Sequence, residues 1–523
     1  MFRLKAFPWE TCLICKHPSL LLATLACFMP FQCLELEAEQ ETPNVILIYA
    51  DDLGYADVGC YGATEVHTPH IDRLAENGIV FTDAHAPAAT CTPSRYAMLT
   101  GEYAWRRKGT GIARGDAPLI IDPETITLAD IFKEGGYHTG VIGKWHLGLG
   151  PEGGPDWNGI IKPGPLELGF DDAFLIPATG DRVPCVYVEN HRVVNLDPRD
   201  PIKVSFRQRI GDEPIGKENP GLLKMHPSHG HDRTIINGIS RIGYMSGGNK
   251  ARWKDEDMAD TITERALRFM EARRQDPFFL FFSLHDIHVP RVPHPRFVGK
   301  TTMGPRGDAI VQTDWCVGKI LEKLQELGLS EKTMVLFTSD NGPVMDDGYR
   351  DRAVEQLGKH QPAGPFRGGK YSAFEGGTRV PWIVSWPGHI KPGKSSALVS
   401  QVDLPACFAD MLKKELPDDG APDSFNVLAA LMGQEDIGRP HLIEQSRTLS
   451  LRHGDWKWIE PSDGPSINKN TNTELVLNQE AQLYYLGDDL GERRNLIKDY
   501  PEKALWCQRK LQAIREAGQS RRP

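Results

Sequence analysis

The chain is 523 residues long, 40% of them hydrophobic and 25% charged, and its formal net charge is −10 at pH 7. Length and composition are those of a globular protein with one large domain or several smaller ones, and the acidic balance argues against a nucleic-acid-binding protein, which would show a basic excess. The cysteines beyond residue 40 stand singly, with no Cys-x-x-Cys pair, so neither a zinc framework nor a small disulfide scaffold is indicated.

An export segment is predicted over residues 1–40. Lys5 and Lys16 precede the apolar run 20–29, which is shorter than the roughly 20 residues that a membrane span needs. We therefore expect an exported protein in a periplasmic, secreted or lysosome-like compartment. No later stretch is apolar enough to span a bilayer, so we expect no transmembrane anchor.

Strands and helices alternate from residue 44 onward. The run 44–50 is continuously apolar and β-branched, which is typical of a strand buried on both faces. A helix follows, with Thr68 as its cap and Pro69 at its first position. The later segments are predicted as a helix from 91, a helix at 127–133, a strand at 138–142, a helix at 257–274, a strand at 278–284, a helix at 308–327 and a strand at 333–338. This alternation predicts an open α/β sheet, whose ligands bind at the carboxyl ends of the strands.

Two segments depart from this alternation. Residues 150–250 are rich in Gly, Pro, Asp and Asn, and we predict a long excursion with short strands, including 185–188 and 193–194. Near the end of the chain we predict a small antiparallel sheet with one closing helix, from strands at 448–451, 456–459 and 482–486 and a helix at 501–517. The chain is therefore divided into the export segment, a catalytic domain over 41–420 and a smaller α+β domain over 421–523.

Cys91 stands at the predicted start of a helix. In Cys91-Thr92-Pro93-Ser94-Arg95 the proline suits a first helical turn and is excluded from a helix interior. Free N–H groups and the positive end of the dipole make a helix N-terminus an anion site. A cysteine placed there is poised for chemistry on an anion. The alternative is a buried small residue beside a turn.

Two pairs of polar residues follow predicted strands. Asp51 and Asp52 come after the first strand, and Asp340 and Asn341 come after the strand at 333–338. Three carboxylates and an amide are hard oxygen ligands that suit Ca²⁺ or Mg²⁺, whereas zinc favours His or Cys. The alternative is that both pairs are turn residues.

The pattern Cys-x-Pro-Ser-Arg at 91–95 resembles the signature of the sulfatase family. Gly-Lys-Trp-His-Leu-Gly at 143–148 and Ser-Asp-Asn-Gly at 339–342 are similar to two further blocks of that family. From about residue 43 to residue 500 the chain resembles sulfatases of the arylsulfatase A and N-acetylgalactosamine-6-sulfatase type. The resemblance implies hydrolysis of sulfate esters by an alkaline-phosphatase-like α/β domain, a mixed sheet flanked by helices, with a smaller C-terminal antiparallel sheet.

The resemblance also implies a modified residue and a metal. Cys91 would become formylglycine (3-oxoalanine) through a formylglycine-generating or an anaerobic sulfatase-maturating enzyme, which reads Pro93 and Arg95. Arg95 would then hold the formylglycine hydrate. The metal, usually Ca²⁺, would contact the modified Cys91 and be held by Asp51, Asp52, Asp340 and Asn341.

Four further residues match catalytic positions of the family. Lys144 and Lys370 would contact the sulfate, His146 would hydrogen-bond the hydrate, and His288 would face the leaving oxygen. The resemblance implies that one hydroxyl of the hydrate would attack sulfur with a metal-bound carboxylate such as Asp340 as base, and that His288 or Lys370 would protonate the departing oxygen. His146 would accept the proton of the second hydroxyl as the aldehyde re-forms and sulfate leaves.

The substrate is predicted from the expected walls of the pocket. The candidate wall residues are Asp181, Arg182, His191, His285 and the segment 346–360, which carries Arg350 and Arg352. Such a polar and basic wall favours a sulfated, partly acidic sugar of a polysaccharide, a galactose or N-acetylgalactosamine sulfate. Two alternatives stay open: a phosphodiesterase or phosphonate hydrolase of the same fold, whose nucleophile is usually Thr or Ser, and a glycan-binding pseudo-sulfatase.

Overall fold

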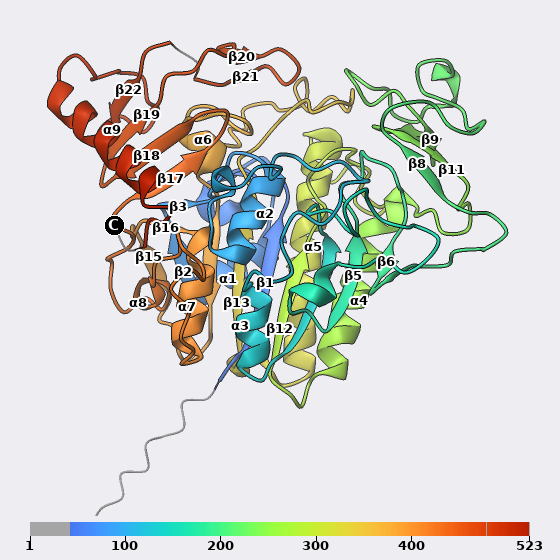
Figure 1. Ribbon diagram of the computed structural model, residues 1–523, viewed down its shortest axis with the longest axis horizontal. Coiled ribbons are helices and arrows are strands. Elements are labelled where there is room, and N and C mark those ends of the chain that lie inside the picture. The colour runs from blue at the N-terminus through green and yellow to red at the C-terminus, as the bar shows by residue number, and fades with distance from the viewer. Residues whose placement is uncertain (1–41, 477–478, 522–523) are drawn as a thin grey trace, which may run out of the picture. The chain divides into compact units, whose positions relative to one another are not determined.

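A ten-stranded mixed sheet forms the centre of the computed structural model, which describes residues 42–476 and 479–521 (Figure 1). Five neighbouring strands, β13, β1, β12, β4 and β5, run parallel, and β14 and β6 flank them in the antiparallel sense. Across the sheet the order is β15 (Gly393–Ser395), β2 (Gly78–Phe81), β14 (Trp382–Ser385), β13 (Thr333–Ser339), β1 (Asn44–Ala50), β12 (Phe278–Ser283), β4 (His138–Lys144), β5 (Asp172–Ile176), β6 (Val188–Glu189) and β7 (Arg192–Val193).

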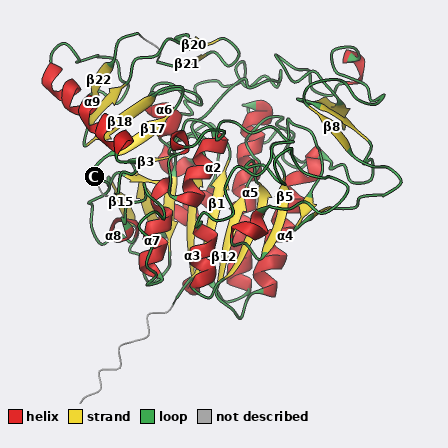
Figure 2. Ribbon diagram, in the orientation of Figure 1, coloured by secondary structure: helices red, strands yellow, loops and turns green. Residues whose placement is uncertain are grey.

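The central strands are buried on both faces. Every residue of β1, β12 and β13 is buried, which confirms the interpretation of their apolar runs as strands covered on two sides. The cover comes from two groups of helices (Figure 2). In the first group, α1 (Pro69–Glu76) and α4 (Met258–Ala272) pack against α5 (Gly304–Glu326). In the second group, three helices pack against one another: α2 (Cys91–Thr100), α3 (Leu128–Glu134) and α7 (Leu404–Met411).

The excursion between β5 and α4 contains short strand pairs. In it β8 (Lys203–Ser205) pairs with β11 (Tyr244–Ser246), and β9 (Ile235–Ile236) pairs with β10 (Ile239–Ser240). The strands predicted at 185–188 and 193–194 each overlap one residue of β6 and β7, which extend one edge of the main sheet.

A smaller antiparallel sheet lies near the end of the described chain, as the sequence predicts, and it has four strands where three were predicted. It contains β17 (Leu442–Gln445), β18 (Leu449–His453), β19 (Trp456–Ile459) and β22 (Gln482–Tyr485), and α9 (Pro501–Glu516) packs on it. The other short elements are β3 (Ala84–His85), which pairs with β16 (Val399–Ser400), the hairpin β20 (Ile467–Asn468) and β21 (Thr473–Glu474), α6 (Glu375–Thr378) and α8 (Leu428–Leu431).

Strand β17 joins the small sheet to the loop that precedes α2. Ala88 and Gln445 form a parallel bridge. Ala89 N donates to Gln445 O at 2.7 Å, and Gln445 N donates to Pro87 O at 3.0 Å. These bonds fix the small sheet against the start of α2, where Cys91 lies.

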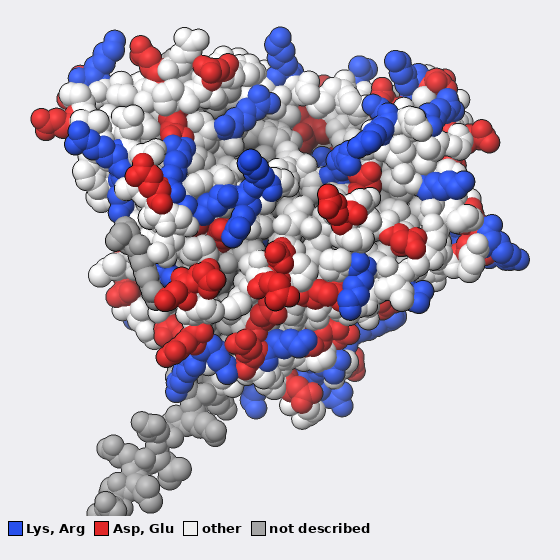
Figure 3. All heavy atoms as spheres, in the orientation of Figure 1, with Lys and Arg blue, Asp and Glu red and all other residues white. Residues whose placement is uncertain are grey.

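The predicted export segment, residues 1–40, lies outside the described residues. Thr42–Pro523 form one unit by their contacts, and the boundary predicted near residue 420 stays a prediction. Among the described helices there is none whose length and apolar character would let it cross a membrane. Lys and Arg side chains are interspersed with Asp and Glu over the face shown in Figure 3, in keeping with the modest net charge.

Candidate functional site

The carboxyl ends of the central parallel strands meet the N-terminus of α2. Each strand end contributes buried polar side chains: Asp51 and Asp52 after β1, Lys144 and His146 at the end of β4, His288 after β12, and Asp340 and Asn341 after β13. Cys91, the first residue of α2, is 2% exposed. The fold thus gathers residues from distant parts of the chain at one edge of the sheet.

His146 presents a proton acceptor to Cys91. The Nδ1 atom of His146 lies 3.3 Å from Cys91 Sγ, and its Nε2 lies 2.9 Å from Ala113 O. A carbonyl oxygen only accepts, so Nε2 carries the hydrogen and the lone pair of a neutral ring is on Nδ1. Burial, and then the charge of Lys144, hold the pKa of His146 well below its ordinary value. His146 is therefore neutral at physiological pH, with its acceptor atom directed at position 91.

The thiol of Cys91 is not activated by its surroundings. Burial raises the pKa of Cys91, and the nearby Lys144 and Lys370 only partly oppose this. Reactive cysteines have lowered thiol pKa values, because the thiolate is the nucleophile. The unmodified side chain is accordingly a protonated thiol at neutral pH.

Three buried carboxylates alternate with three buried cations. Lys144 Nζ forms an ion pair with Asp51 and lies 3.7 Å from Asp340 Oδ2. Arg95 Nε donates to Asp340 Oδ2 at 2.9 Å, and Lys370 Nζ donates to Asp52 Oδ2 at 2.9 Å. The pairing is close to neutral overall, which offsets much of the cost of removing the charges from water.

The pKa values of two of these carboxylates shift in opposite directions. Burial, and then the negative charge of Asp340, raise the pKa of Asp51 well above its ordinary value. Burial also disfavours the charge of Asp52, but Lys370 and Lys144 outweigh it and lower the pKa of Asp52. Asp51 thus lies in a local excess of negative charge that an added cation would relieve.

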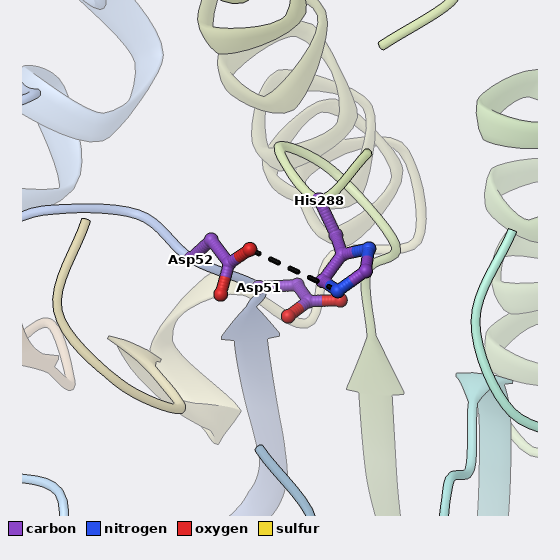
Figure 4. A group of neighbouring side chains, drawn as sticks. All are labelled: Asp51, Asp52 and His288. Carbon is purple, nitrogen blue, oxygen red and sulfur yellow. Dashed lines mark ion pairs between the residues drawn. The ribbon is translucent and has the colours of Figure 1, made fainter. Parts of the chain in front are cut away.

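The donor set fits a hard divalent cation. Asp51 Oδ1 and Asn341 Oδ1 are buried and have no hydrogen-bond partner among the described residues. One ligand atom each of Asp51, Asp52 and His288 lie within 4.8 Å of one another (Figure 4). Carboxylate and amide oxygens are the ligands of Ca²⁺ and Mg²⁺. His288 was predicted to face the leaving oxygen and was not expected among the metal ligands, and the structure places it beside the carboxylates.

Arg95 contacts the strand ends. Its guanidinium pairs with Asp340, and Nη1 donates to Lys144 O at 3.2 Å and to Ser283 Oγ at 2.5 Å. Through these bonds Arg95 ties α2 to the ends of β13, β4 and β12. The role predicted for Arg95 in holding a formylglycine hydrate stays a prediction.

The two histidines after β12 have different partners. His288 Nδ1 lies 2.7 Å from Val289 O, so it carries the hydrogen, and His288 Nε2 lies 3.9 Å from Asp52 Oδ2. Burial, and then the charge of Lys370, hold the pKa of His288 well below its ordinary value. His285 Nε2 accepts a hydrogen bond from Gly180 N at 2.9 Å, which holds the loop that carries Asp181 and Arg182.

A cavity of about 510 Å³ opens above this group. Cys91, His288, Lys370, Asp181 and Arg182 line it. Asp347, from the predicted wall 346–360, lines it as well, and so do residues that the sequence did not predict, among them His229, His231, Tyr371, Gln445, Arg447, Asn468, Asn470 and Thr471. The only sequence signal for the unpredicted ones was His-x-His at 229–231.

Arg350 and Arg352 do not join this group. Both are exposed and lie outside the described residues that line the cavity, and the same loop directs Asp347 inward instead. Asp347 Oδ2 accepts from Lys370 Nζ at 2.8 Å, which explains its inward direction. His191 also lies outside the lining, 3.1 Å from Glu167 Oε1.

Comparisons with known proteins agree with this arrangement. The family model described as Sulfatase matches residues 43–414. The chain is 54% identical over 477 residues to N-acetylgalactosamine-6-O-sulfatase of Bacteroides thetaiotaomicron, covering 91% of this chain and 93% of that protein. It is 31% identical over 484 residues to arylsulfatase A of Homo sapiens, covering 87% of this chain and 83% of that protein.

The fold is also found among solved structures. One from work on the metabolism of multiple glycosaminoglycans by Bacteroides thetaiotaomicron superposes with a TM-score of 0.90 at 53% identity, covering 91% of this chain and 100% of that one. The alkaline-phosphatase-like architecture expected from the motifs is thereby confirmed, and the phosphodiesterase and pseudo-sulfatase alternatives are not favoured. The chain belongs to the sulfatase family, and it is a sulfuric ester hydrolase.

Proposed function

We propose that this sulfatase removes the 6-sulfate of N-acetylgalactosamine in a sulfated polysaccharide, with Cys91 as formylglycine and with a bound Ca²⁺, for which Mg²⁺ is the alternative. The observation that carries the proposal is the position of Cys91 beside neutral His146, at the end of a buried row of alternating carboxylates and cations. The choice of sugar rests on the 54% identity to N-acetylgalactosamine-6-O-sulfatase.

The two groups that the proposal requires fit the residues present. Asp51, Asp52, Asp340 and Asn341 would hold the ion, and two of their buried oxygen atoms have no partner among the described residues. When bound, the ion supplies positive charge to a sulfate oxygen. Formylglycine supplies two hydroxyls in its hydrated form, one for attack and one for release, which a protonated thiol lacks.

The residues around position 91 bind the sulfate and accept a proton. Lys144 and Lys370 supply fixed positive charge for the sulfate, which is more effective in a buried site than in water. His146 Nδ1 accepts a proton from the side chain at position 91, while the Nε2–H bond to Ala113 O keeps the ring in the required orientation. These side chains are almost fully buried, so bulk water is kept from the sulfate.

The leaving oxygen needs a proton donor. His288 Nε2 is the ring atom on the side of Asp52, and in the neutral ring it has a lone pair. His288 therefore donates only after it has gained a proton, whereas the ammonium of Lys370 already carries one. Both residues line the cavity, and they are the two candidates for this step.

Export is part of the same proposal. It is supported by the two lysines and the apolar run before residue 30. A sulfatase acting on polysaccharides meets its substrate outside the cytoplasm.

A screen with defined sugars tests the proposal. The full chain would be coexpressed with a formylglycine-generating enzyme, and released sulfate would be measured with N-acetylgalactosamine 6-sulfate, N-acetylgalactosamine 4-sulfate and N-acetylglucosamine 6-sulfate. We expect kcat/KM to be highest for the first. A preference for either of the other two would refute the substrate assignment, and failure on all sulfate esters would refute the mechanism.

A further inference from the structure

Arg447 is a charged residue of the cavity wall that has no partner among the described residues. It lies in the turn between β17 and β18, its side chain is exposed, and it makes no hydrogen bond or ion pair with any described residue. The other charged residues of the described lining are paired: Asp181 with Arg182, and Asp347 with Lys370. A cation left free in a site where the other charges are satisfied is available to a ligand.

The backbone of this turn is held in a fixed position beside the nucleophile. Gln445 is bonded on both sides to the loop before α2, through Ala89 N and Pro87 O. Ser446 N donates to Thr448 O at 2.9 Å, which closes the turn around Arg447. The guanidinium is thus attached to a support that is rigid relative to Cys91.

Arg447 and the catalytic group lie at different depths. Cys91 and Lys370 are 2% and 1% exposed, whereas Arg447 is exposed at the mouth of the same cavity. With the sulfate ester at the bottom, a group that reaches Arg447 belongs to a different part of the substrate.

The cleft offers room for more than one sugar. Thr471, in the loop of the β20–β21 hairpin, lines both the main cavity and an adjoining one of about 280 Å³. The adjoining cavity continues along Pro343 and Gly369, next to the catalytic loops. An oligosaccharide that enters the main cavity can therefore extend past the hairpin.

We propose that Arg447 binds an anionic group, a carboxylate or a second sulfate, on the sugar next to the sulfated residue, and so selects acidic oligosaccharides over neutral ones. The planar fork of an arginine matches both anions with two parallel hydrogen bonds. The inference rests on the proposed function, because it takes the position of the sulfated sugar from there.

The test compares substrates within one variant. Arg447→Gln and wild type would be assayed on N-acetylgalactosamine 6-sulfate, on a disaccharide in which a hexuronic acid is its neighbour, and on the same disaccharide with the carboxyl reduced to an alcohol. We expect Arg447→Gln to raise KM for the uronic acid disaccharide about 5- to 30-fold relative to the other two substrates, the range of a charge-assisted contact near the surface. Arg447→Lys should recover part of the loss.

Arg192→Gln is the matched control, since Arg192 is exposed on β7 and outside the cavity lining. It should leave all three KM values unchanged. A fourth substrate separates the two anions. It is the carboxyl-reduced disaccharide with a second sulfate on the neighbouring sugar. If Arg447→Gln raises KM for this substrate alone, Arg447 binds that sulfate.

The inference would be overturned if Arg447→Gln changed KM equally for every substrate, or if it changed KM for none of them. The proposed function is judged separately, by whether wild type desulfates the monosaccharide at all.

Discussion

At the scale of single residues, the protonation of position 91 leads to the first prediction. Because burial keeps Cys91 a protonated thiol, turnover should depend on its conversion to formylglycine. Cys91→Ser should fold normally and lose multiple turnover, since serine supplies one hydroxyl. Mass spectrometry of active protein should show the Cys91 peptide as an aldehyde, lighter than the thiol form. Full activity of protein whose Cys91 is unmodified would contradict this.

The second prediction separates sulfate binding from leaving-group chemistry. General acid catalysis contributes about 10²–10⁴-fold, and more when the leaving group is poor. His288→Ala should therefore impair a sugar sulfate far more than an aryl sulfate, whose phenolate leaves easily. Lys144→Ala should impair both alike, because the sulfate is common to them. The measurement is kcat/KM of each variant on both substrates. Equal losses for His288→Ala would assign the proton donor to Lys370.

At the scale of elements, the ends of β1 and β13 together make the metal site. A chelator should abolish activity, and Ca²⁺ or Mg²⁺ should restore it. An ion that binds only the folded state adds about 2.7 kcal/mol of stability at 100 times its Kd, so Ca²⁺ should also raise the Tm of chelator-treated protein. Asn341→Ala, which removes a buried oxygen with no partner among the described residues, should reduce that shift. Rescue by zinc alone would argue against oxygen ligands.

Helix α5 caps the neighbouring helix α1 through Asp314. Asp314 Oδ1 accepts from His70 N at 3.0 Å and from Ile71 N at 2.8 Å. Burial raises the pKa of Asp314 to about 7, against the opposing effect of these two donors. The folded state therefore holds this proton more tightly than the unfolded state, and stability should fall as pH rises from the ordinary aspartate pKa to about 7, by at most about 1.4 kcal/mol per unit.

Asp314→Asn tests this linkage. It keeps the acceptor oxygen and removes the titration, so urea unfolding should show a flatter dependence of stability on pH between 4 and 7 and a more stable protein at pH 8. Asp314→Ala removes the cap as well and should cost about 0.5–2 kcal/mol. An unchanged pH slope in Asp314→Asn would place the titrating group elsewhere.

At the scale of the whole molecule, buried Glu375 of α6, in the segment that leads into β14 of the main sheet, contacts the small C-terminal sheet. It accepts from Arg452 Nη1 at 2.8 Å and from Lys457 Nζ at 2.9 Å, both on the small sheet, and from Arg379 Nη1 at 2.9 Å. Burial opposes its charge, but Arg452 and Lys457 hold the pKa of Glu375 well below its ordinary value. The carboxylate stays ionised and fixes the sheet that carries Arg447.

Removing Glu375 should therefore destabilise the entire fold. Glu375→Ala removes one negative charge from a buried network in which Arg452 and Arg379 keep Asp83 and Lys457 keeps Glu444. The buried positive charge that is then incompletely balanced should cost up to about 3–5 kcal/mol. Glu264→Ala, which breaks an exposed helix pair with Arg268, should cost less than about 1 kcal/mol and is the control. Denaturant unfolding measures both. A loss below 1 kcal/mol for Glu375→Ala would show that the sheets dock without this carboxylate.

The sequence alone determined the features that depend on local pattern. Continuous apolar runs predicted β1, β12 and β13, because a strand covered on both faces needs apolar residues at every position. Short β2, β14 and β17 were missed, although β19 and β22, which are equally short, were predicted. Family motifs identified the catalytic candidates, since their spacing is preserved within single loops.

Only the tertiary structure decided how the cavity is walled. Asp347 turns inward because Lys370 pairs with it, whereas Arg350 and Arg352 on the same loop stay in solvent, and the loop's sequence does not distinguish them. Arg447 reaches the cavity because Gln445 bonds to the loop before α2, a contact between segments far apart in the chain. Such long-range pairings arise from the packing of whole elements, so the specificity of this sulfatase could not be inferred from the residues around Cys91.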